Sequence, residues 1–417
     1  MSPIFEGPLT TSEMLEVFSE RNFLEAMLRF EASLARAQAS VGLIPEAAAQ
    51  SIIGTCKAEL FDVAKIVREG GRAGSIAIPL VKSLKETVAL FNQDAAAYVH
   101  FGASSQDLID TALALVTRTA LDLIESDVRK AVDALLVLAR QHVDDPVLVR
   151  TLMQPVSATS FGLQCAGWAA PLVRSLQRLQ LARPHALGVQ LGGTVGTLGR
   201  MQNKGKDVGP DVLALMAAEL SLWAPDFAWQ TQRSEWVALG CELGLLVGSL
   251  GKMARDLALM SQFEVGELAE AVEPGRAGSP VMHRRKLVAC TVALAAAQRA
   301  PQRVAALLAA VPQEQERLLG NWQAELAEWP GLLMSAHGAA RAMALALPGL
   351  QVNVQRMRAN LEAVRETLPP EDAAQWFCSR LAENAAELAR AQTRMLVDVL
   401  ATLAEARGEA NAAKAAL

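Results

Sequence analysis

The sequence predicts an all-α protein built around a central bundle of long helices, and three observations support this. Long Ala- and Leu-rich segments with few internal glycines or prolines run well beyond the ordinary helix length of about 11–12 residues. Hydrophobic residues make up 52% of the 417-residue chain and charged residues only 20%. The mean hydropathy is +0.22. Because a lone soluble monomer rarely hides this much apolar surface, we expect long helix faces to pack against further copies of the chain.

The predicted elements follow in order along the chain. From about Ser12 to Ser40 apolar side chains recur at helical spacing, and two or three short helices follow as far as Tyr98. After a turn from Phe101 to Gln106, the long helical segments are Asp107 to His142, Ser160 to Leu181, Gln232 to Gln262, Leu287 to Leu318 and Leu326 to Leu347. From Gln351 onward we expect two or three shorter helices, interrupted at Pro369-Pro370.

These elements predict a three-part subunit. Residues 1–106 would form an N-terminal helical domain and residues 107–350 the central long-helix bundle. Residues 351–417 would form a small, shortened C-terminal helical domain whose low-complexity end frays.

Composition and charge exclude several classes of protein. A net charge of −5 and a pI near 5.7 argue against a nucleic-acid partner. The longest uncharged run, Thr151 to Val173, is long enough to span a bilayer, but its prolines and its Gln, Ser and Thr residues lead us to reject a membrane span. Five cysteines without a CxxC pair, and no signal sequence, predict a reduced, cytoplasmic protein. The five histidines lack metal-ligand spacing, so we expect no metal and no cofactor.

The first of three polar clusters precedes the first long helix. It runs from His100 to Asp107 and places Ser104, Ser105 and Gln106 at a helix N-terminus, whose free N–H groups and positive dipole end suit a carboxylate. Ordinary N-capping by Ser105, with an acidic residue in the first turn, is the simpler local explanation. Capping accounts for one serine and leaves the rest of the set unexplained.

The second cluster, Arg150 to Gly162, precedes the next long helix. It supplies neutral hydrogen-bonding groups, among them Gln154 and Thr159, inside an otherwise apolar run where unsatisfied polar groups would be costly. Either a ligand or backbone capping would satisfy them.

The third cluster is the segment from Glu273 to Val288, which centres on Ser279. Its two glycines and two prolines exclude a regular helix. The cations around the serine are Arg276, His283, Arg284, Arg285 and Lys286. Positive charge of this kind stabilises a serine alkoxide and attracts carboxylate substrates, although a basic loop is often only a solvated surface.

Short segments distributed along the chain carry a family resemblance when taken together. They are Ile78 to Lys82, His100 to Thr111, Gly192-Gly193 with Gly196-Thr197, Thr231 to Arg233, Glu264 to Glu267, Gln313 to Arg317 and Trp322 to Glu325. In this order they resemble the fumarase/aspartase superfamily, and most closely its 3-carboxy-cis,cis-muconate cycloisomerase branch. The resemblance covers roughly residues 10–365.

The resemblance implies a homotetramer in which each active site is assembled from three subunits, so that the three polar clusters form one site. In this family a serine of a flexible loop, within a GSSxMPxKxN signature, moves the proton alpha to a carboxylate, while the lysine and asparagine bind that carboxylate. Ser279 matches the second serine and is the predicted catalytic residue.

This chain departs from the family pattern at several positions. Gly278, Met282, Arg284 and Lys286 replace the first serine, the proline, the lysine and the asparagine of the signature. The pocket stays cationic, but a guanidinium binds as a planar fork and an ammonium as a point charge. Leu152, Gln230 and Gln315 stand where relatives often carry histidine, and cycloisomerases usually carry tryptophan at position 152. A histidine general acid is therefore not expected at these positions.

The resemblance thus implies a cofactor-independent cycloisomerase or lyase that acts on a polycarboxylate, with 3-carboxy-cis,cis-muconate as the first choice. The predicted substrate-binding residues are Ser104, Ser105, Gln106, Gln154, Thr159, Arg233, His283, Arg284 and Lys286. One alternative is a C–N or C–O lyase of the same superfamily that acts on a succinyl or substituted-succinate substrate. Another is a helical scaffold or metabolite-binding relative that has lost turnover.

Overall fold

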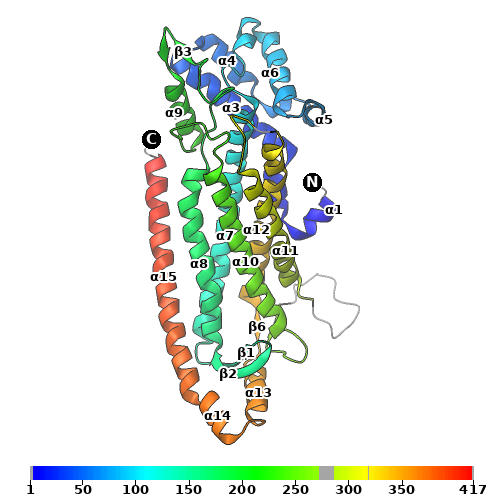
Figure 1. Ribbon diagram of the computed structural model, residues 1–417, viewed down its shortest axis with the longest axis vertical. Helices are drawn as coiled ribbons and strands as arrows, with labels where there is room; N and C mark the ends of the chain where they lie inside the picture. The colour runs from blue at the N-terminus through cyan, green and yellow to red at the C-terminus, as the bar shows by residue number, and fades with distance from the viewer. Residues whose placement is uncertain (1–2, 272–285, 318, 416–417) are drawn as a thin grey trace.

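Five long helices run antiparallel along the molecule and form its central bundle (Figure 1). The computed structural model describes residues 3–271, 286–317 and 319–415. The bundle helices are α7 (Ser105–Gln141), α8 (Phe161–Ala186), α10 (Ser234–Met260), α11 (Val288–Ala310) and α12 (Asn321–Ala346). The all-α prediction is confirmed, and each predicted long segment corresponds to one of these helices, with ends displaced by one to eight residues.

The helix α7 lies at the centre of the bundle because apolar side chains cover most of its circumference. Leu121, Ile124, Val128, Val132 and Leu135 recur at intervals of three or four residues, and all are fully buried. The helix contacts α3, α8 and α12. Its 37 residues extend over roughly 55 Å at about 1.5 Å per residue.

Small residues allow some bundle helices to approach each other closely. At Gly251 of α10, an added Cβ would lie 2.4 Å from the Cβ of Ala297 on α11, a distance that no packed pair of carbons tolerates. The close approach therefore requires glycine at this position.

One end of the bundle, at which α7 begins, carries most of the N-terminal half of the chain; we call it the head end (top of Figure 1). Here lie α3 (Glu20–Ser40), α4 (Glu46–Thr55), α5 (Val63–Ala73), α6 (Ala77–Phe91), α9 (Gly209–Leu220) and the short hairpin of β3 (Gln202–Asn203) and β4 (Lys206–Asp207). The chain begins with α1 (Pro3–Glu6) and α2 (Ser12–Val17). Pro79 lies in the first turn of α6, where its missing N–H is not needed.

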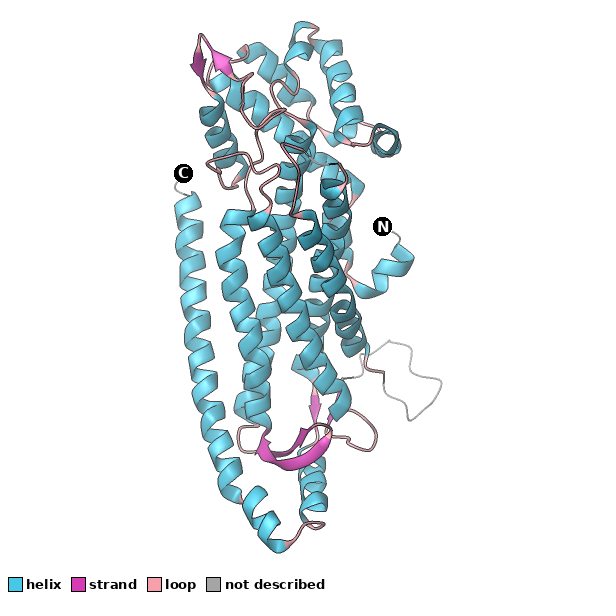
Figure 2. Ribbon diagram, viewed as in Figure 1, coloured by secondary structure: helices cyan, strands magenta, loops and turns pink. Residues whose placement is uncertain are grey.

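The opposite end carries small β-structures, and we call it the hairpin end (Figure 2). The strands β1 (Pro146–Thr151) and β2 (Gln154–Ser160) form an antiparallel hairpin there, and β5 (Leu268–Ala269) pairs with β6 (Gln351–Val352). The sequence did not predict strands in this region. The helices α13 (Val354–Arg365) and α14 (Pro370–Trp376) follow.

The C-terminal segment forms three helices that are interrupted at Pro369-Pro370, as predicted, but the last of them is long rather than short. The chain turns back at α14, and α15 (Ser379–Ala415) is a single helix of 37 residues that runs along the bundle beside α8 (Figure 1). The buried residues of α15 include a set spaced four or seven residues apart, that is, one or two helical turns: Ala385, Ala389, Leu396 and Leu403. These side chains lie on one face of α15 and form the stripe that packs against the bundle.

One bundle helix, α10, is long and apolar enough by composition to cross a membrane, with a mean hydropathy of 1.4 over its most apolar window. However, 56% of that window is buried inside the molecule. Because α10 packs against α8, α11 and α12, its apolar character is that of a core helix.

Candidate functional site

The predicted site residues of one chain lie at opposite ends of the bundle. Ser104, Ser105 and Gln106 lie at the head end, where α7 begins, whereas Gln154 and Thr159 lie on β2 at the hairpin end. The two groups are separated by the length of α7, roughly 55 Å at about 1.5 Å per residue. Within a single chain, the structure therefore does not bring the first two polar clusters together.

The third cluster lies mostly outside the described residues. Ser279, His283 and Arg284 belong to the part of the chain that the structure does not describe, whereas Lys286 is exposed just before α11. The flanks of this part are joined, because the carboxylate of Glu270 accepts hydrogen bonds from the N–H groups of Ala289 (3.1 Å) and Cys290 (2.9 Å). Glu270 thus caps the N-terminus of α11 from outside the helix. The described residues on the two sides of the third cluster therefore lie next to each other.

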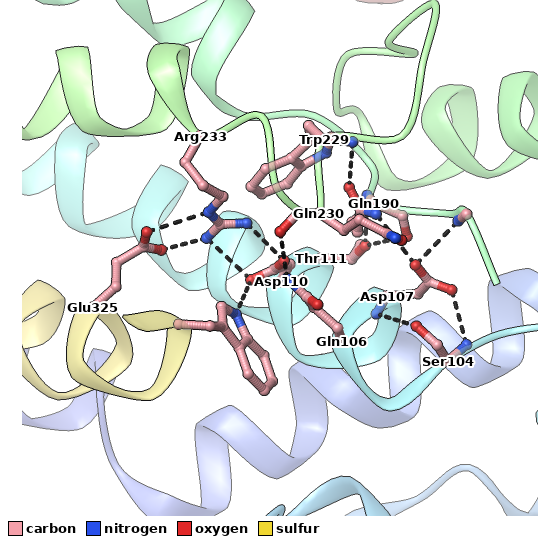
Figure 3. A network of polar contacts seen from close by, with 12 residues as sticks. Ser104, Gln106, Asp107, Asp110, Thr111, Gln190, Trp229, Gln230, Arg233 and Glu325 are labelled. Carbon is pink, nitrogen blue, oxygen red and sulfur yellow. Dashed lines mark hydrogen bonds and ion pairs between the residues drawn. The ribbon is translucent and has the colours of Figure 1, made fainter. Parts of the chain in front are cut away.

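At the head end, Ser104 is the N-cap of α7, rather than Ser105 as the simplest local explanation held (Figure 3). The Ser104 hydroxyl accepts a hydrogen bond from the Asp107 N–H (3.2 Å), and the Asp107 carboxylate accepts one from the Ser104 N–H (2.8 Å). The same carboxylate also accepts from the N–H groups of Gly192 (3.0 Å) and Gly193 (2.9 Å). Burial raises the pKa of Asp107, although these hydrogen bonds favour its ionised form.

A network of amide groups joins the loops of the head end to α7. The side-chain amide of Gln106 donates to the backbone carbonyl of Gln230 (2.8 Å), and the amide of Gln230 donates to the carbonyl of Glu316 (3.1 Å). Arg317 donates to the carbonyl of Gly193 (2.8 Å). Gln106, predicted to bind substrate, therefore has a structural hydrogen bond of its own, which engages one of its two side-chain N–H donors.

The side chain of Arg233 is fully buried, although the residue was predicted to bind substrate. Figure 3 shows its guanidinium between Asp110 and Glu325. Its guanidinium donates to Asp110 of α7 (2.7 Å) and to both carboxylate oxygens of Glu325 of α12. The Trp322 indole N–H donates to the same aspartate (2.9 Å), and the Trp229 ring lies 4.5 Å from the guanidinium.

These contacts give Arg233 a structural role, and its substrate-binding role stays a prediction. Burial would lower the pKa of Arg233, but the two carboxylates outweigh burial and raise it. Burial raises the pKa of Glu325, and Arg233 opposes that rise. Arg233 is thus a buried cation that ties the start of α10 to α7 and α12.

Sequence reasoning missed Asp110 and Glu325, which are the partners of Arg233. Asp110 stands among apolar residues of the predicted helix from Asp107 to His142, Glu325 directly precedes the one predicted from Leu326, and both carboxylates are fully buried. That signal was available, because a buried carboxylate almost always has a cationic partner. The sequence did not identify that partner, because Arg233 lies 123 residues from Asp110 and 92 residues from Glu325 along the chain.

At the hairpin end, the turn between β1 and β2 presents two large apolar side chains. Leu152 and Met153 both adopt left-handed backbone conformations, with φ of 50° and 66°, and their side chains are 96% and 72% exposed. Two-residue hairpin turns of this kind normally contain Asn or Gly, so the turn is strained as well as exposed. Such strain is typical of segments that serve a binding or catalytic role.

The hairpin is anchored to the bundle by a buried carboxylate. Arg150 of β1 forms an ion pair with Glu267 (3.1 Å), which also accepts a hydrogen bond from Asn360 of α13 (2.9 Å). On β2, Gln154 is exposed beside the turn, and Thr159 is half-buried opposite Val147. Among the residues that the structure describes, no three His, Cys, Asp or Glu side chains gather into a metal-binding group.

A family profile and several cycloisomerases match this chain. The sequence profile of the family described as "Lyase" matches residues 7–286. The chain is 41% identical to a 3-carboxy-cis,cis-muconate cycloisomerase of Pseudomonas putida over 86% of this chain and 84% of the relative. It is 39% identical to that of Bradyrhizobium diazoefficiens over 96% and 90%.

A relative with another activity is also similar. The chain is 37% identical to a nitrosuccinate lyase of Streptomyces davaonensis over 82% of this chain and 73% of the relative. Among solved structures, the 3-carboxy-cis,cis-muconate lactonizing enzyme of Pseudomonas putida matches with a TM-score of 0.81 and 38% identity. That match covers 96% of this chain and 90% of the other.

Proposed function

The chain belongs to the lyase family of the fumarase/aspartase superfamily, and we propose that within this family it acts as a 3-carboxy-cis,cis-muconate cycloisomerase. The observation that supports this choice is the extent of the likeness to cycloisomerases. At 39% identity it spans 96% of the chain, and so it includes both ends of the bundle. No cofactor takes part in the proposed reaction.

In the proposed reaction, a carboxylate oxygen of the substrate adds to one carbon of a C=C bond and closes a lactone. The electron pair of that bond moves to the other carbon, which lies alpha to a second carboxylate, and an aci-carboxylate intermediate results. The hydroxyl of Ser279 then gives its proton to this carbon. The reverse sequence is a β-elimination in which Ser279 removes the proton, so one site serves both directions.

The carboxylates of the substrate require positive charge and N–H donors. At the head end, the N-terminus of α7 supplies its dipole and the polar groups of Ser104 and Ser105. His283, Arg284 and Lys286 would contribute cationic groups, and Gln154 and Thr159 neutral hydrogen bonds.

We propose that these groups meet only between subunits of a homotetramer, three of which surround each site. The separation of roughly 55 Å between the two ends of α7 supports this, because one chain cannot close that distance. Exposed apolar residues along the bundle, including Leu181, Leu245 and Leu308, offer surface for packing. A cleft of about 1110 Å³ between α8 and α10, lined largely by apolar residues, is part of the same surface.

A panel of substrates tests the proposed function. Purified enzyme is offered 3-carboxymuconate, fumarate, argininosuccinate, adenylosuccinate and substituted succinates, and their ultraviolet absorbance is followed. We expect 3-carboxymuconate to be consumed fastest. Consumption of another acid with 3-carboxymuconate untouched would contradict the proposal.

The second candidate is a C–N or C–O lyase that acts on a substituted succinate. It is favoured by the likeness to a nitrosuccinate lyase at 37% identity, together with the replaced signature residues Gly278, Arg284 and Lys286. Release of a nitrogen or oxygen leaving group in the same panel would support it. No turnover of any acid, with retained binding, would instead favour the metabolite-binding relative.

A further inference from the structure

A buried carboxylate and a histidine form a close pair beside the head-end cluster. Glu31, on α3, is 1% exposed, and its Oε1 lies 2.5 Å from Nδ1 of His100. The second oxygen of Glu31 is buried and has no hydrogen-bond partner. The His100 side chain is 13% exposed, and its backbone is left-handed with φ of 59°.

The Glu31–His100 pair would lower the stability of the fold if its only role were packing. Glu31 lies on the apolar face of α3 next to Phe30 and near Leu34, both fully buried. A buried ion pair is often no more stabilising than apolar residues of similar size, and an unsatisfied carboxylate oxygen adds a further cost. A non-glycine residue with left-handed backbone adds strain, which tends to gather at functional sites.

Three charged groups act on His100 from three elements. Burial alone would lower the pKa of His100. The charge and hydrogen bond of Glu31 on α3, and the charge of Asp107 on α7, outweigh burial and raise it, while Lys85 on α6 opposes the rise. His100 therefore holds its second proton at a higher pH than an ordinary histidine does.

The position of His100 connects this proton to the proposed site. Three residues separate it from Ser104, the N-cap of α7, and the charge of Asp107 in the first turn of that helix acts on it. Because Nδ1 is engaged by Glu31, Nε2 is the ring nitrogen left for a ligand. An imidazolium here would add a full positive charge to the partial charge of the helix N-terminus.

Resting on the proposed function, we propose that Glu31 is a positioning residue that holds the His100 ring through Nδ1, and that the His100 imidazolium binds a carboxylate of the substrate at the start of α7. Glu31 fixes the ring through Nδ1 and compensates its charge. The Nε2–H group donates to the substrate carboxylate. The chain thus has a cationic histidine at the head end, although Gln230 and Gln315 stand where relatives often have one.

The first measurement is the titration of His100 without substrate. Imidazole ¹³C NMR, or carbethoxylation of the His100 peptide followed by mass spectrometry, gives its pKa in the parent, in Glu31→Gln and in Glu31→Asp. We expect Glu31→Gln to lower the pKa of His100, because the charge and hydrogen bond of Glu31 raise it, and Glu31→Asp to preserve most of that rise. Glu25→Gln, which removes an exposed carboxylate of the same helix that pairs with Arg21, should leave it unchanged. An unaltered pKa in Glu31→Gln would overturn the proposal.

The second measurement asks whether His100 meets a polycarboxylate, and it needs no turnover. Tricarballylate should raise the pKa of His100 in the parent, because a bound carboxylate favours the imidazolium. His100→Gln should weaken tricarballylate binding roughly 10- to 100-fold, the usual effect of losing a charged hydrogen bond. Tricarballylate that binds equally to both proteins and leaves the His100 pKa unmoved would overturn the substrate contact, even if Glu31 holds the proton.

A third measurement links the pair to turnover. In Glu31→Gln, the alkaline limb of kcat/KM should move to lower pH together with the His100 pKa, and Glu31→Asp should restore it. A merely structural role would reduce activity evenly across pH. Failure of the proposed function appears separately, as no turnover of 3-carboxymuconate by a parent enzyme that still shows both pKa effects.

Discussion

Ser279 is the residue on which the proposed chemistry depends. Replacing it with alanine should lower turnover by roughly 10²–10⁴-fold, the usual loss when a general acid or base is removed. The melting temperature should change little, as is usual when a single hydroxyl is removed from the surface, where the sequence predicts Ser279 to lie. Ser40→Ala, at the exposed end of α3, is the matched control and should retain full turnover. Normal turnover in Ser279→Ala would move the proton-transfer role to another group.

Arg233 provides the clearest contrast between structure and binding. Arg233→Gln would leave Asp110 and Glu325 buried without a cation, and we expect a loss of about 3–5 kcal/mol in the free energy of unfolding. Arg36→Gln breaks an exposed ion pair with Glu219 and should cost less than about 1 kcal/mol. Urea unfolding at one protein concentration measures both. A stable Arg233→Gln protein with only a raised KM would contradict the structural role and support the substrate-binding role.

The raised pKa of His100 makes the stability of the protein depend on pH. Because the pKa is higher in the folded state, protonation of His100 stabilises that state fully below the ordinary histidine pKa of about 6.5, and the contribution is lost as pH rises through the folded value. The stability difference between the parent and His100→Gln, measured by urea unfolding, should therefore be largest near about pH 5.5 and smaller near about pH 8.5. A difference that grows with pH would contradict the raised pKa.

At the scale of elements, the start of α7 depends on Asp107 more than on its cap. Ser104→Ala removes one capping hydroxyl and should cost about 1 kcal/mol. Asp107→Ala also leaves the N–H groups of Gly192 and Gly193 without their acceptor, and we expect roughly 3 kcal/mol or more. Hydrogen exchange should accelerate at these two amides in Asp107→Ala only. Equal effects of the two substitutions would show that the glycine contacts contribute little.

The long helices could be predicted from sequence because their signal is local. Residues such as Leu121, Ile124 and Val128 repeat the helical period over many turns. The β1–β2 hairpin could not be predicted, because its turn contains Leu152 and Met153 in place of the usual Asn-Gly. The length of α15 was not predicted, because several of its buried residues are alanines, which leave a weak periodic signal.

The candidate site was predictable in part for the same reason. The residues around Ser104 form a motif that is contiguous in sequence, and the structure places them at a helix N-terminus as expected. The pairings of Arg233 with Asp110 and Glu325, and of His100 with Glu31, join distant segments. Only the folded chain shows which buried charges meet.

At the scale of the whole molecule, the separated clusters lead to the central claim, which is a site shared between subunits. The three-part division into residues 1–106, 107–350 and 351–417 and the cytoplasmic location remain predictions. Light scattering at micromolar concentration should give the mass of four chains. A monomeric mass would remove the basis for a shared site.

The most direct test of the central claim is complementation between two inactive variants. Ser105→Glu places a negative charge where the substrate carboxylate would bind, while an acidic residue at a helix N-terminus remains favourable for folding. Ser279→Ala removes the proton-transfer group. Each homotetramer alone should be nearly inactive.

The two variants are then co-expressed with different tags, and tetramers that carry both tags are purified. If the head end and the loop of one site come from different subunits, about one quarter of the sites in a random one-to-one mixture have both intact groups, and activity should return to about that fraction. If both groups of a site belong to one chain, every site carries a defect. Mixed tetramers as inactive as the two parents would contradict the shared site.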